Sequence, residues 1–230
     1  GVSFYTFHAI SYLVDVYRQK TPPQKNLLRL GLYLALFPKL VMGPIVPYHE
    51  LEPALAQRTP SVQDVSDGCF RFTIGLAKKA LLDFHCGMRP EGLLPGKTPT
   101  AYCQVISTFS LHYAYALWEY VEHTGDLALG RCYRTDIDRI LDYYESKRDE
   151  TGLVGKITPW AFMDWQDDWK DLSGVSPAYF EGSSTIINLM YAWALACGAK
   201  LYEATGRPGT AMEYRKRRAE ILEKVRALCF

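Results

Sequence analysis

The sequence predicts an all-α protein, in which helical hairpins follow apolar helices of the membrane type. Two observations favour the hairpins: apolar residues recur at helical spacing through residues 104–228, and landmarks in these segments recur at an interval of 81 residues. A third observation concerns the beginning of the chain, where two long apolar runs lie within residues 1–48. The hairpins and the apolar runs differ enough to predict two parts, residues 1–82 and residues 83–230.

Length and composition fit one large core or two small domains. The chain has 230 residues, of which 48% are hydrophobic and 22% charged, as in ordinary folded proteins. Residues 1–82 carry nine Lys/Arg against five Asp/Glu, a net charge of +4, whereas the remainder carries −3. This asymmetry is typical of a junction between unrelated pieces. It is too mild and too unclustered to indicate a nucleic-acid partner, so none is expected.

Six cysteines form neither a C-x-x-C pair nor a Cys/His cluster with zinc spacing. We therefore expect no metal and no cofactor, and we predict buried free thiols in a reducing compartment. The apolar start lacks a basic region and a small-residue cleavage site, so it does not look like a signal peptide. The cytoplasm is the expected location of residues 83–230.

The first part contains two apolar runs, Gly1–Tyr17 and Leu27–Tyr48. The second has the length of about 20 residues that a membrane helix needs. It is interrupted by Pro38, Lys39, Gly43 and Pro44. These breaks favour a discontinuous or re-entrant segment that packs against other protein. A helical core outside the membrane, with exposed lysines, is the open alternative.

Three blocks of the first part, Gly1–Arg18, Leu32–Leu55 and Gly68–Leu82, resemble the membrane-bound O-acyltransferase family. The likeness is to its bacterial branch, which acylates alginate and other cell-envelope polymers, and its most specific pattern is FP-x-L-x-x-GPI-V at Phe37–Val46. The resemblance implies that residues 1–82 derive from an integral membrane protein and can contact a membrane.

The catalytic histidine of that family lies in an Arg-Arg-Trp-His-type segment, which is absent from this sequence. His8 and His49 do not occupy the matching position, so both are interpreted as packed or interfacial histidines. As an acyltransferase, the first part is expected to be inactive.

The second part contains four predicted helices: Gln104–His123, Leu127–Lys147, Thr185–Ala204 and Pro208–Leu228. The first and third end at Thr-Gly pairs typical of helix C-termini, and Ser183 or Ser184 is the expected N-cap of the third. Thr124-Gly125, Tyr133-Arg134 and Ile140-Leu141 recur as Thr205-Gly206, Tyr214-Arg215 and Ile221-Leu222. The repeating unit is therefore a hairpin with a tight turn and a long return, and several such units must stack to bury their apolar faces.

The long return Asp149–Gly182 must lie opposite the short turns, and it contains WAFMDWQDDWK at Trp160–Lys170. Flat rings beside carboxylates suit a carbohydrate, because rings cover its C–H face while carboxylates hold its hydroxyls. The predicted binding residues are Trp160, Asp164, Trp165, Asp168 and Trp169. The alternative is that Trp160 and Trp165 only cover the core. Asn188 and Tyr191 fit either a pocket or the core, His112 is interpreted as a core histidine, and the acidic residues of the helices are interpreted as solvent-facing.

Three blocks of this second part, Glu91–Asp126, Gly152–Trp169 and the Asn188-bearing helix up to Tyr202, resemble the catalytic domain of bacterial α-L-rhamnosidases. The resemblance covers about Asp83–Phe230. It implies part of an (α/α)6 toroid, an L-rhamnose-containing carbohydrate as partner, and inverting hydrolysis of terminal α-L-rhamnosides. It also places Asp164 and Trp165 of the D-W motif, and Trp160, at the rhamnose subsite.

Inverting hydrolysis needs a general acid and a general base. In this family the acid belongs to an acidic, arginine-containing motif upstream of the E-G-L-L-P block, and the base glutamate lies after the last helix seen here. Glu181 and Asp168 are the only local substitutes, and the family pattern supports neither. No catalytic residue is therefore predicted, and the chain is interpreted as an inactive glycosidase fragment.

Two alternatives stay open: a fragment of a membrane-bound O-acyltransferase, and a non-catalytic helical binding scaffold. The sequence near Leu82-Asp83 has no Pro/Gly/Ser linker, which domain fusions usually show. The hypothesis for this feature is a chimeric or misassembled reading frame.

Overall fold

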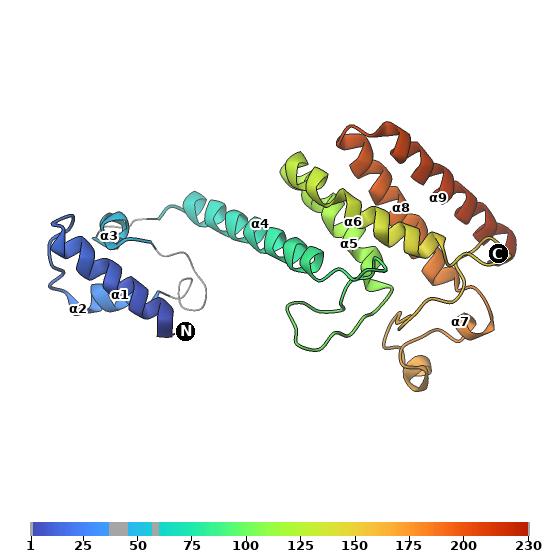
Figure 1. The fold of residues 1–230 in the computed structure, drawn as a ribbon, viewed down its shortest axis with the longest axis horizontal. Helices are drawn as coiled ribbons and strands as arrows, with labels where there is room; N and C mark the ends of the chain where they lie inside the picture. Colours follow the sequence, from blue (N-terminus) through green and yellow to red (C-terminus); the bar gives the residue numbers. More distant parts are fainter. Residues whose placement is uncertain (1, 37–45, 57–59, 230) are drawn as a thin grey trace. The chain divides into compact units, whose positions relative to one another are not determined.

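The computed structural model describes residues 2–36, 46–56 and 60–229, and divides into two compact units, residues 1–68 and 69–230 (Figure 1). The helices are α1 (Val2–Tyr17), α2 (Leu27–Ala35), α3 (Tyr48–Ala56), α4 (Val62–Cys86), α5 (Phe109–Thr124), α6 (Leu127–Glu145), η2 (Asp167–Leu172), α7 (Ala178–Glu181), α8 (Thr185–Ala204) and α9 (Pro208–Cys229). In the described residues the other regular structure consists of isolated β-bridges. The all-α prediction is confirmed.

The first unit is held together by tyrosine rings. Tyr33 and Tyr48 are fully buried and meet edge to face, with ring centroids 5.1 Å apart. His8 is buried against Tyr33, whereas the Nδ1 atom of His49 lies 2.8 Å from a carboxylate oxygen of Asp15. Both histidines therefore have packing or pairing roles in this unit, as the sequence indicated.

The prediction of apolar helices of membrane type is wrong for the residues that the structure describes. Within them, no helix combines the length and the apolar character needed to cross a bilayer. The first, α1, has 16 residues and carries the buried carboxylate of Asp15, and α2 ends at Ala35 after only nine residues. A span needs about 20 apolar residues. The interruptions expected between Pro38 and Pro44 lie outside the described residues.

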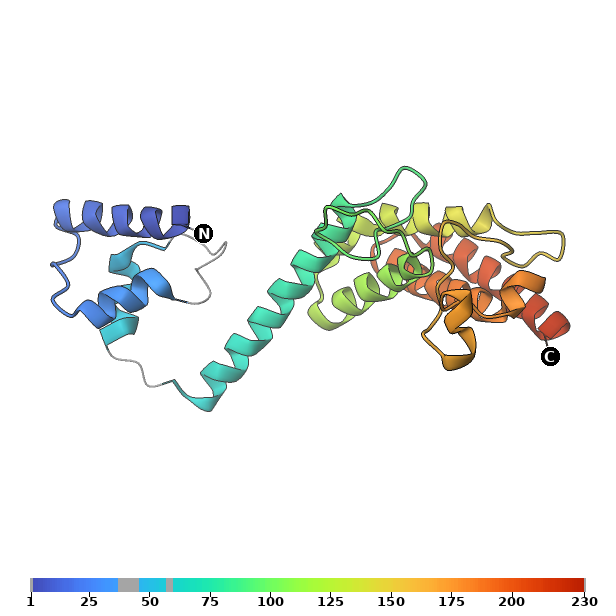
Figure 2. The same cartoon turned by 90° about the horizontal axis from the view of Figure 1, so that it is seen from below.

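The 81-residue repeat appears as two helical hairpins, α5–α6 and α8–α9. At the two corners, the hydroxyl groups of Thr124 and Thr205 donate to the carbonyl oxygen four residues earlier, at 2.6 and 2.7 Å. Gly125 and Gly206 follow with φ of 69° and 81°, the left-handed conformation that glycine adopts without strain. The four helices run side by side, with both corners at one end and the long connections at the other (Figures 1 and 2).

The core of the second unit lies where α5, α6, α8 and α9 meet. Ile140 and its repeat partner Ile221 are both fully buried, and α8 buries most of its length. Because α8 packs against α5, α6 and α9, its residues must be small or apolar on several faces. The helix therefore lacks the one-sided pattern of a surface helix, and its predicted bounds, Thr185–Ala204, are confirmed.

The turn that follows α4 has the same backbone pattern as the turn that follows α6. In the first turn, the amide of Arg89 donates to the carbonyl oxygen of Leu93, and the amide of Gly92 donates to that of Arg89. In the second turn, the amide of Asp149 donates to the carbonyl oxygen of Leu153, and the amide of Gly152 donates to that of Asp149. Gly92 and Gly152 have φ of 91° and 81°. The two turns are thus equivalent, and α4 stands to α5 in the chain as α6 stands to α8.

Candidate functional site

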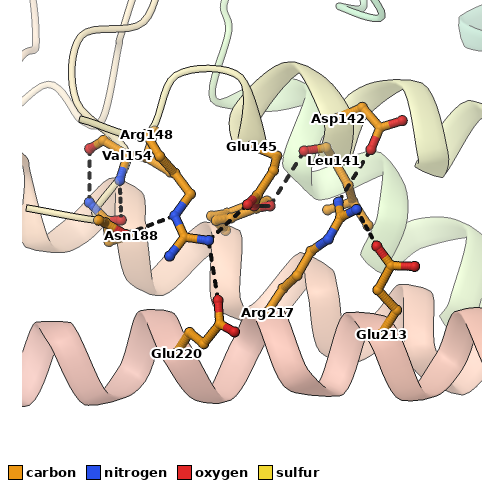
Figure 3. Close-up of polar contacts among 11 residues, drawn as sticks. Leu141, Asp142, Glu145, Arg148, Val154, Asn188, Glu213, Arg217 and Glu220 are labelled. Carbon is orange, nitrogen blue, oxygen red and sulfur yellow. Dashed lines mark hydrogen bonds and ion pairs between the residues drawn. The ribbon is translucent and has the colours of Figure 1, made fainter. Parts of the chain in front are cut away.

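The tryptophan-rich connection between α6 and α8 is fixed at both of its ends. The buried side chain of Asn188 accepts a hydrogen bond from the amide of Val154 (2.8 Å) and donates to its carbonyl oxygen (3.0 Å; Figure 3). The hydroxyl of Ser183 donates to the carboxylate of Asp149 at 2.5 Å. Ser184, one of the two predicted N-cap residues, occupies the N-cap position of α8, but its side chain makes no capping hydrogen bond.

The middle of the connection is attached to the start of α5. The amide of Ser107 donates to the carbonyl oxygen of Trp160 at 2.9 Å, and its hydroxyl donates to Thr158 at 2.6 Å. The hydroxyl of Thr108 donates to the carbonyl oxygen of Phe162 at 2.5 Å. These bonds hold residues 158–162 against the start of α5. They also explain why the helix begins at Phe109 and not at the predicted Gln104, because Ser107 and Thr108 are bonded to the loop.

Three aromatic rings gather on this segment. The ring centroids of Trp160 and Trp165 both lie 5.2 Å from that of Phe162 and 6.3 Å from each other. Phe162 is 9% exposed, whereas Trp165 is 62% exposed, so a buried ring supports a solvent-facing one. The indole of Trp160 donates to the carbonyl oxygen of Ser173 at 3.0 Å. Phe162, which is not among the predicted binding residues, packs against both tryptophan rings.

The carboxylates of the motif divide into two sets. Asp164 is exposed beside Trp165, and one of its oxygens accepts the amide of Trp165 at 2.8 Å. Asp168 is also exposed, but it belongs with the half-buried Trp169 to the short helix η2. Trp160, Asp164 and Trp165 therefore form one group, while Asp168 and Trp169 occupy a neighbouring element.

Gly174 closes this loop. Its carbonyl oxygen accepts the amides of Met163 and Asp164, its φ is 72°, and an added Cβ would lie 2.4 Å from the ring of Phe162. We expect Gly174→Ala to move Phe162 and to disorder the Trp160–Trp165 group, at a cost of about 2 kcal/mol for the positive φ and the collision with the Phe162 ring. Near-ultraviolet circular dichroism would measure the change.

The control is Gly182→Ala, since Gly182 has extended backbone and an added Cβ meets nothing within 4 Å. An aromatic signal that is the same in both variants would contradict the role assigned to Gly174.

Tyr191, considered above for the pocket, lies in the core. It is buried, and its hydroxyl donates to the carboxylate of Glu145 at 2.7 Å. Arg148 donates to the same carboxylate at 2.8 Å, and Arg217 of α9 donates to Asp142 of α6 at 3.3 Å (Figure 3). These polar contacts join α6 to α8 and α9, so Tyr191 serves the helical scaffold, as does Asn188, which holds Val154 to α8.

Two aspartates interpreted as solvent-facing are engaged inside the helical array. Asp136 is 3% exposed, and one of its oxygens lies 2.7 Å from Nδ1 of His85 and accepts the hydroxyl of Tyr113 at 3.0 Å. Asp138 accepts the hydroxyls of Tyr202 and Tyr214. The interpretation was wrong because tyrosine and histidine partners on other helices satisfy these carboxylates.

The cysteines are free, as predicted, but most are not buried. Cys69, Cys86, Cys103 and Cys132 are exposed, Cys229 is half-buried and Cys197 is buried. Burial raises the pKa of the Cys197 thiol to about 11, so this side chain remains protonated and packs as a small apolar group.

Five carboxyl groups among the described residues have a shifted pKa. The groups with shifted values are Asp15, Glu91, Asp126, Glu145 and Asp149. All are shifted downward. For Glu145, burial opposes the charged form, but hydrogen bonds from Arg148 and Tyr191 outweigh it and lower the pKa. Each shift stabilises a carboxylate that serves as an acceptor, whereas a general acid needs a raised pKa.

The family model of the bacterial α-L-rhamnosidase six-hairpin glycosidase domain matches residues 66–228. This match covers more than half of the chain. The chain belongs to this family. The crystal structure of a GH78 rhamnosidase from Bacillus sp. GL1 is similar to this chain, with a TM-score of 0.58 and 23% identity over 66% of the chain and 15% of the rhamnosidase. At this level the likeness concerns the fold.

The chain also has curated relatives of another kind over part of its length. Over 82 residues it is 42% identical to the probable alginate O-acetylase AlgI of Pseudomonas aeruginosa, which covers 36% of this chain and 16% of AlgI. The peptidoglycan O-acetyltransferase of Helicobacter pylori is 27% identical and covers 56% of this chain and 30% of that protein. The chain thus spans less than a third of either curated relative.

Proposed function

We propose that the glycosidase-like part binds a terminal α-L-rhamnosyl group at Trp160, Asp164 and Trp165, and that this chain does not hydrolyse it. The observation that carries the proposal is the exposed indole of Trp165, supported from beneath by Phe162 and placed next to an exposed carboxylate. A ring in this setting can cover the apolar face of a sugar, while Asp164 accepts its hydroxyl protons.

Asp168 and Trp169 are proposed to extend this surface toward the rest of the glycoside. Their place on η2, next to the first group in the chain, supports this arrangement. The absence of hydrolysis is supported by the sequence upstream of the E-G-L-L-P block, which lacks the acidic, arginine-containing motif that supplies the general acid in the resembled family.

Binding is tested by titrating methyl α-L-rhamnoside into the full chain and following heat or tryptophan fluorescence. We expect Trp165→Ala and Asp164→Ala each to weaken binding about tenfold, which corresponds to about 1.4 kcal/mol. Phe180→Ala removes an exposed ring from the same connection, and Asp171→Ala removes an exposed carboxylate from it, so both serve as matched controls. Equal losses in all four variants, or no binding by the wild type, would contradict the proposal.

Hydrolysis is tested separately with an aryl α-L-rhamnoside. We expect no release of the aryl group by the wild-type chain. Release that is lost in Asp164→Ala would show that a competent acid–base pair exists, and would overturn this half of the proposal without affecting the binding half.

A second candidate function concerns residues 1–82, because the chain is similar over 82 residues to a probable alginate O-acetylase. We propose that this part derives from a membrane-bound O-acyltransferase and contacts lipid without acyl transfer. Flotation of the full chain with phospholipid vesicles is the measurement. Recovery of the protein only in the lipid-free fraction would contradict lipid contact.

A further inference from the structure

Helix α1 of the first unit turns apolar side chains outward and polar side chains inward. On its inner face, His8 and Asp15 are only 1% and 6% exposed. The side chains on the opposite face are apolar and between 38% and 88% exposed; this outer stripe consists of Phe7, Ile10, Leu13, Val14 and Tyr17. A helix on a protein surface in water shows the reverse distribution, with its apolar stripe toward the core. The inverted distribution indicates that the outer stripe meets an apolar partner.

The outer stripe leads at Tyr17 into a strongly basic segment. This basic turn joins α1 to the first residues of α2, and its four cations are all exposed: Arg18, Lys20, Lys25 and Arg29. Between Asp15 and Glu50 the sequence contains no acidic residue. The ion pairs among the described residues of the first unit join His49 to these two carboxylates, so the four cations stand outside them. The basic turn therefore carries positive charge that no ion pair in this unit neutralises.

Hydrogen bonds to buried groups hold the basic turn in place. The amide of Gln24 donates to the hydroxyl of Tyr12 at 2.8 Å, and its side chain donates to the hydroxyl of Tyr48 at 2.6 Å. The buried Thr21 donates to the carboxylate of Glu52 in α3 at 2.6 Å. Because its backbone is already ordered, the turn loses little conformational entropy when its cations bind a ligand.

The apolar surface resumes on the far side of the basic turn. Leu27 and Leu28, at the start of α2, are 80% and 85% exposed. The cations thus lie between these leucines and the exposed ring of Tyr17. Such a combination fits the boundary of a lipid bilayer, where aromatic rings lie at the level of the headgroups and lysine and arginine contact lipid phosphates.

We propose that the outer stripe and the basic turn together bind the surface of an anionic phospholipid bilayer. The stripe enters the headgroup layer, as the apolar face of an interfacial helix does, while the cations pair with the phosphates of acidic lipids. This inference rests on the second candidate function, which proposes lipid contact, and it adds the class of lipid and the residues that recognise it. Each basic residue near an anionic leaflet raises the affinity about fivefold, whereas a zwitterionic leaflet has no net charge to attract it.

The test is the flotation of the full chain with two kinds of vesicle, one of phosphatidylcholine alone and one of phosphatidylcholine mixed with phosphatidylglycerol. The basic-turn variant replaces three exposed cations by glutamine: Arg18→Gln, Lys20→Gln and Lys25→Gln. The matched control makes the same three changes at exposed positions of α9: Arg218→Gln, Lys216→Gln and Lys224→Gln. Both variants lose the same charge, so they differ only in where the charge is lost.

The stripe variant carries Ile10→Gln and Leu13→Gln. Both positions are exposed and glutamine is tolerated in helices, so α1 should form as before. Circular dichroism checks the folding of every variant, and sedimentation of the lipid-free chain checks whether it associates with itself.

We expect the wild-type chain to prefer the anionic vesicles and added salt to weaken this preference. The basic-turn variant should bind the anionic vesicles about 100-fold more weakly, while the α9 control binds them as the wild type does. The stripe variant should bind both kinds of vesicle more weakly, because it removes the apolar contribution that the two surfaces share.

Equal binding of the wild type to the two kinds of vesicle would overturn the recognition of anionic headgroups and leave lipid contact itself supported. Binding to neither kind would contradict lipid contact as well. Equal losses in the basic-turn variant and the α9 control would overturn the assignment to the basic turn. Self-association of the lipid-free chain that the stripe variant abolishes would assign the outer stripe to a protein contact, and would also overturn the proposal.

Discussion

Replacing Gly92 by alanine is expected to lower the free energy of unfolding of the second unit by about 4 kcal/mol. Gly92 adopts a φ of 91°, and a Cβ there would lie 2.4 Å from the carbonyl oxygen of Arg139 in α6. Arg139 also donates to the carbonyl oxygens of Arg89 and Pro90, at 3.0 and 3.2 Å. The turn cannot move away from α6 without losing these bonds, so the collision has no inexpensive relief.

Gly152→Ala is the matched control, because it makes the same change in the equivalent turn. Its φ is 81°, but the atom nearest to an added Cβ lies at 3.6 Å and belongs to the flexible side chain of Lys224. Only the backbone strain remains, and we expect a loss of about 1 kcal/mol. The difference between the two variants therefore measures the close approach of the turn to α6.

Urea unfolding followed by tryptophan fluorescence is the appropriate measurement, because all five tryptophans lie in the second unit. Midpoints that shift equally for Gly92→Ala and Gly152→Ala would contradict the contact between Gly92 and Arg139. They would leave the equivalence of the two turns unaffected.

Local signals predicted the hairpins well. Thr-Gly corners and Pro208 define helix ends through backbone conformation, which depends on residues close in sequence, and α8 and the start of α9 follow the prediction. The start of α5 did not, because Ser107 and Thr108 bond to a loop about fifty residues later in the chain. Such a contact leaves no periodic pattern in the sequence.

The candidate site was predictable in composition and not in arrangement. The motif identified Trp160, Asp164 and Trp165, which lie together, but it gave Phe162 no special role although that ring supports the others. Asp168 belongs to a separate short helix. Spacing along an irregular loop does not determine which side chains converge, since no helical or strand period applies there.

The boundary near Leu82-Asp83 also shows the limits of local composition. The predicted change in charge and resemblance falls there, yet the family match begins at residue 66, α4 continues from Val62 to Cys86, and the units divide at residue 68. A change of sequence origin and a change of compact unit need not coincide. The boundary between residues 82 and 83 therefore remains a prediction about sequence origin.

Replacing Asn188 by alanine is expected to destabilise the second unit by about 3 kcal/mol. The amide side chain is fully buried and satisfies the amide and the carbonyl oxygen of Val154 as well as the carbonyl oxygen of Ser184. Alanine would leave the amide and the carbonyl oxygen of Val154 buried without partners, whereas the carbonyl oxygen of Ser184 would keep the backbone amide of residue 188. Each unpartnered group costs about 1–3 kcal/mol, reduced where water can enter.

Ser110→Ala is the matched control, because the hydroxyl of Ser110 serves the equivalent position in the earlier repeat and accepts one hydrogen bond, from the amide of Leu94 at 2.9 Å. We expect a loss of about 1 kcal/mol there. The larger loss for Asn188 should come with earlier exposure of Trp160 and Trp165, since Asn188 ties Val154, at the start of the tryptophan-rich connection, to α8. Equal losses of unfolding free energy in the two variants would contradict this expectation, because they would mean that the bonds of Asn188 to the long connection add nothing to stability.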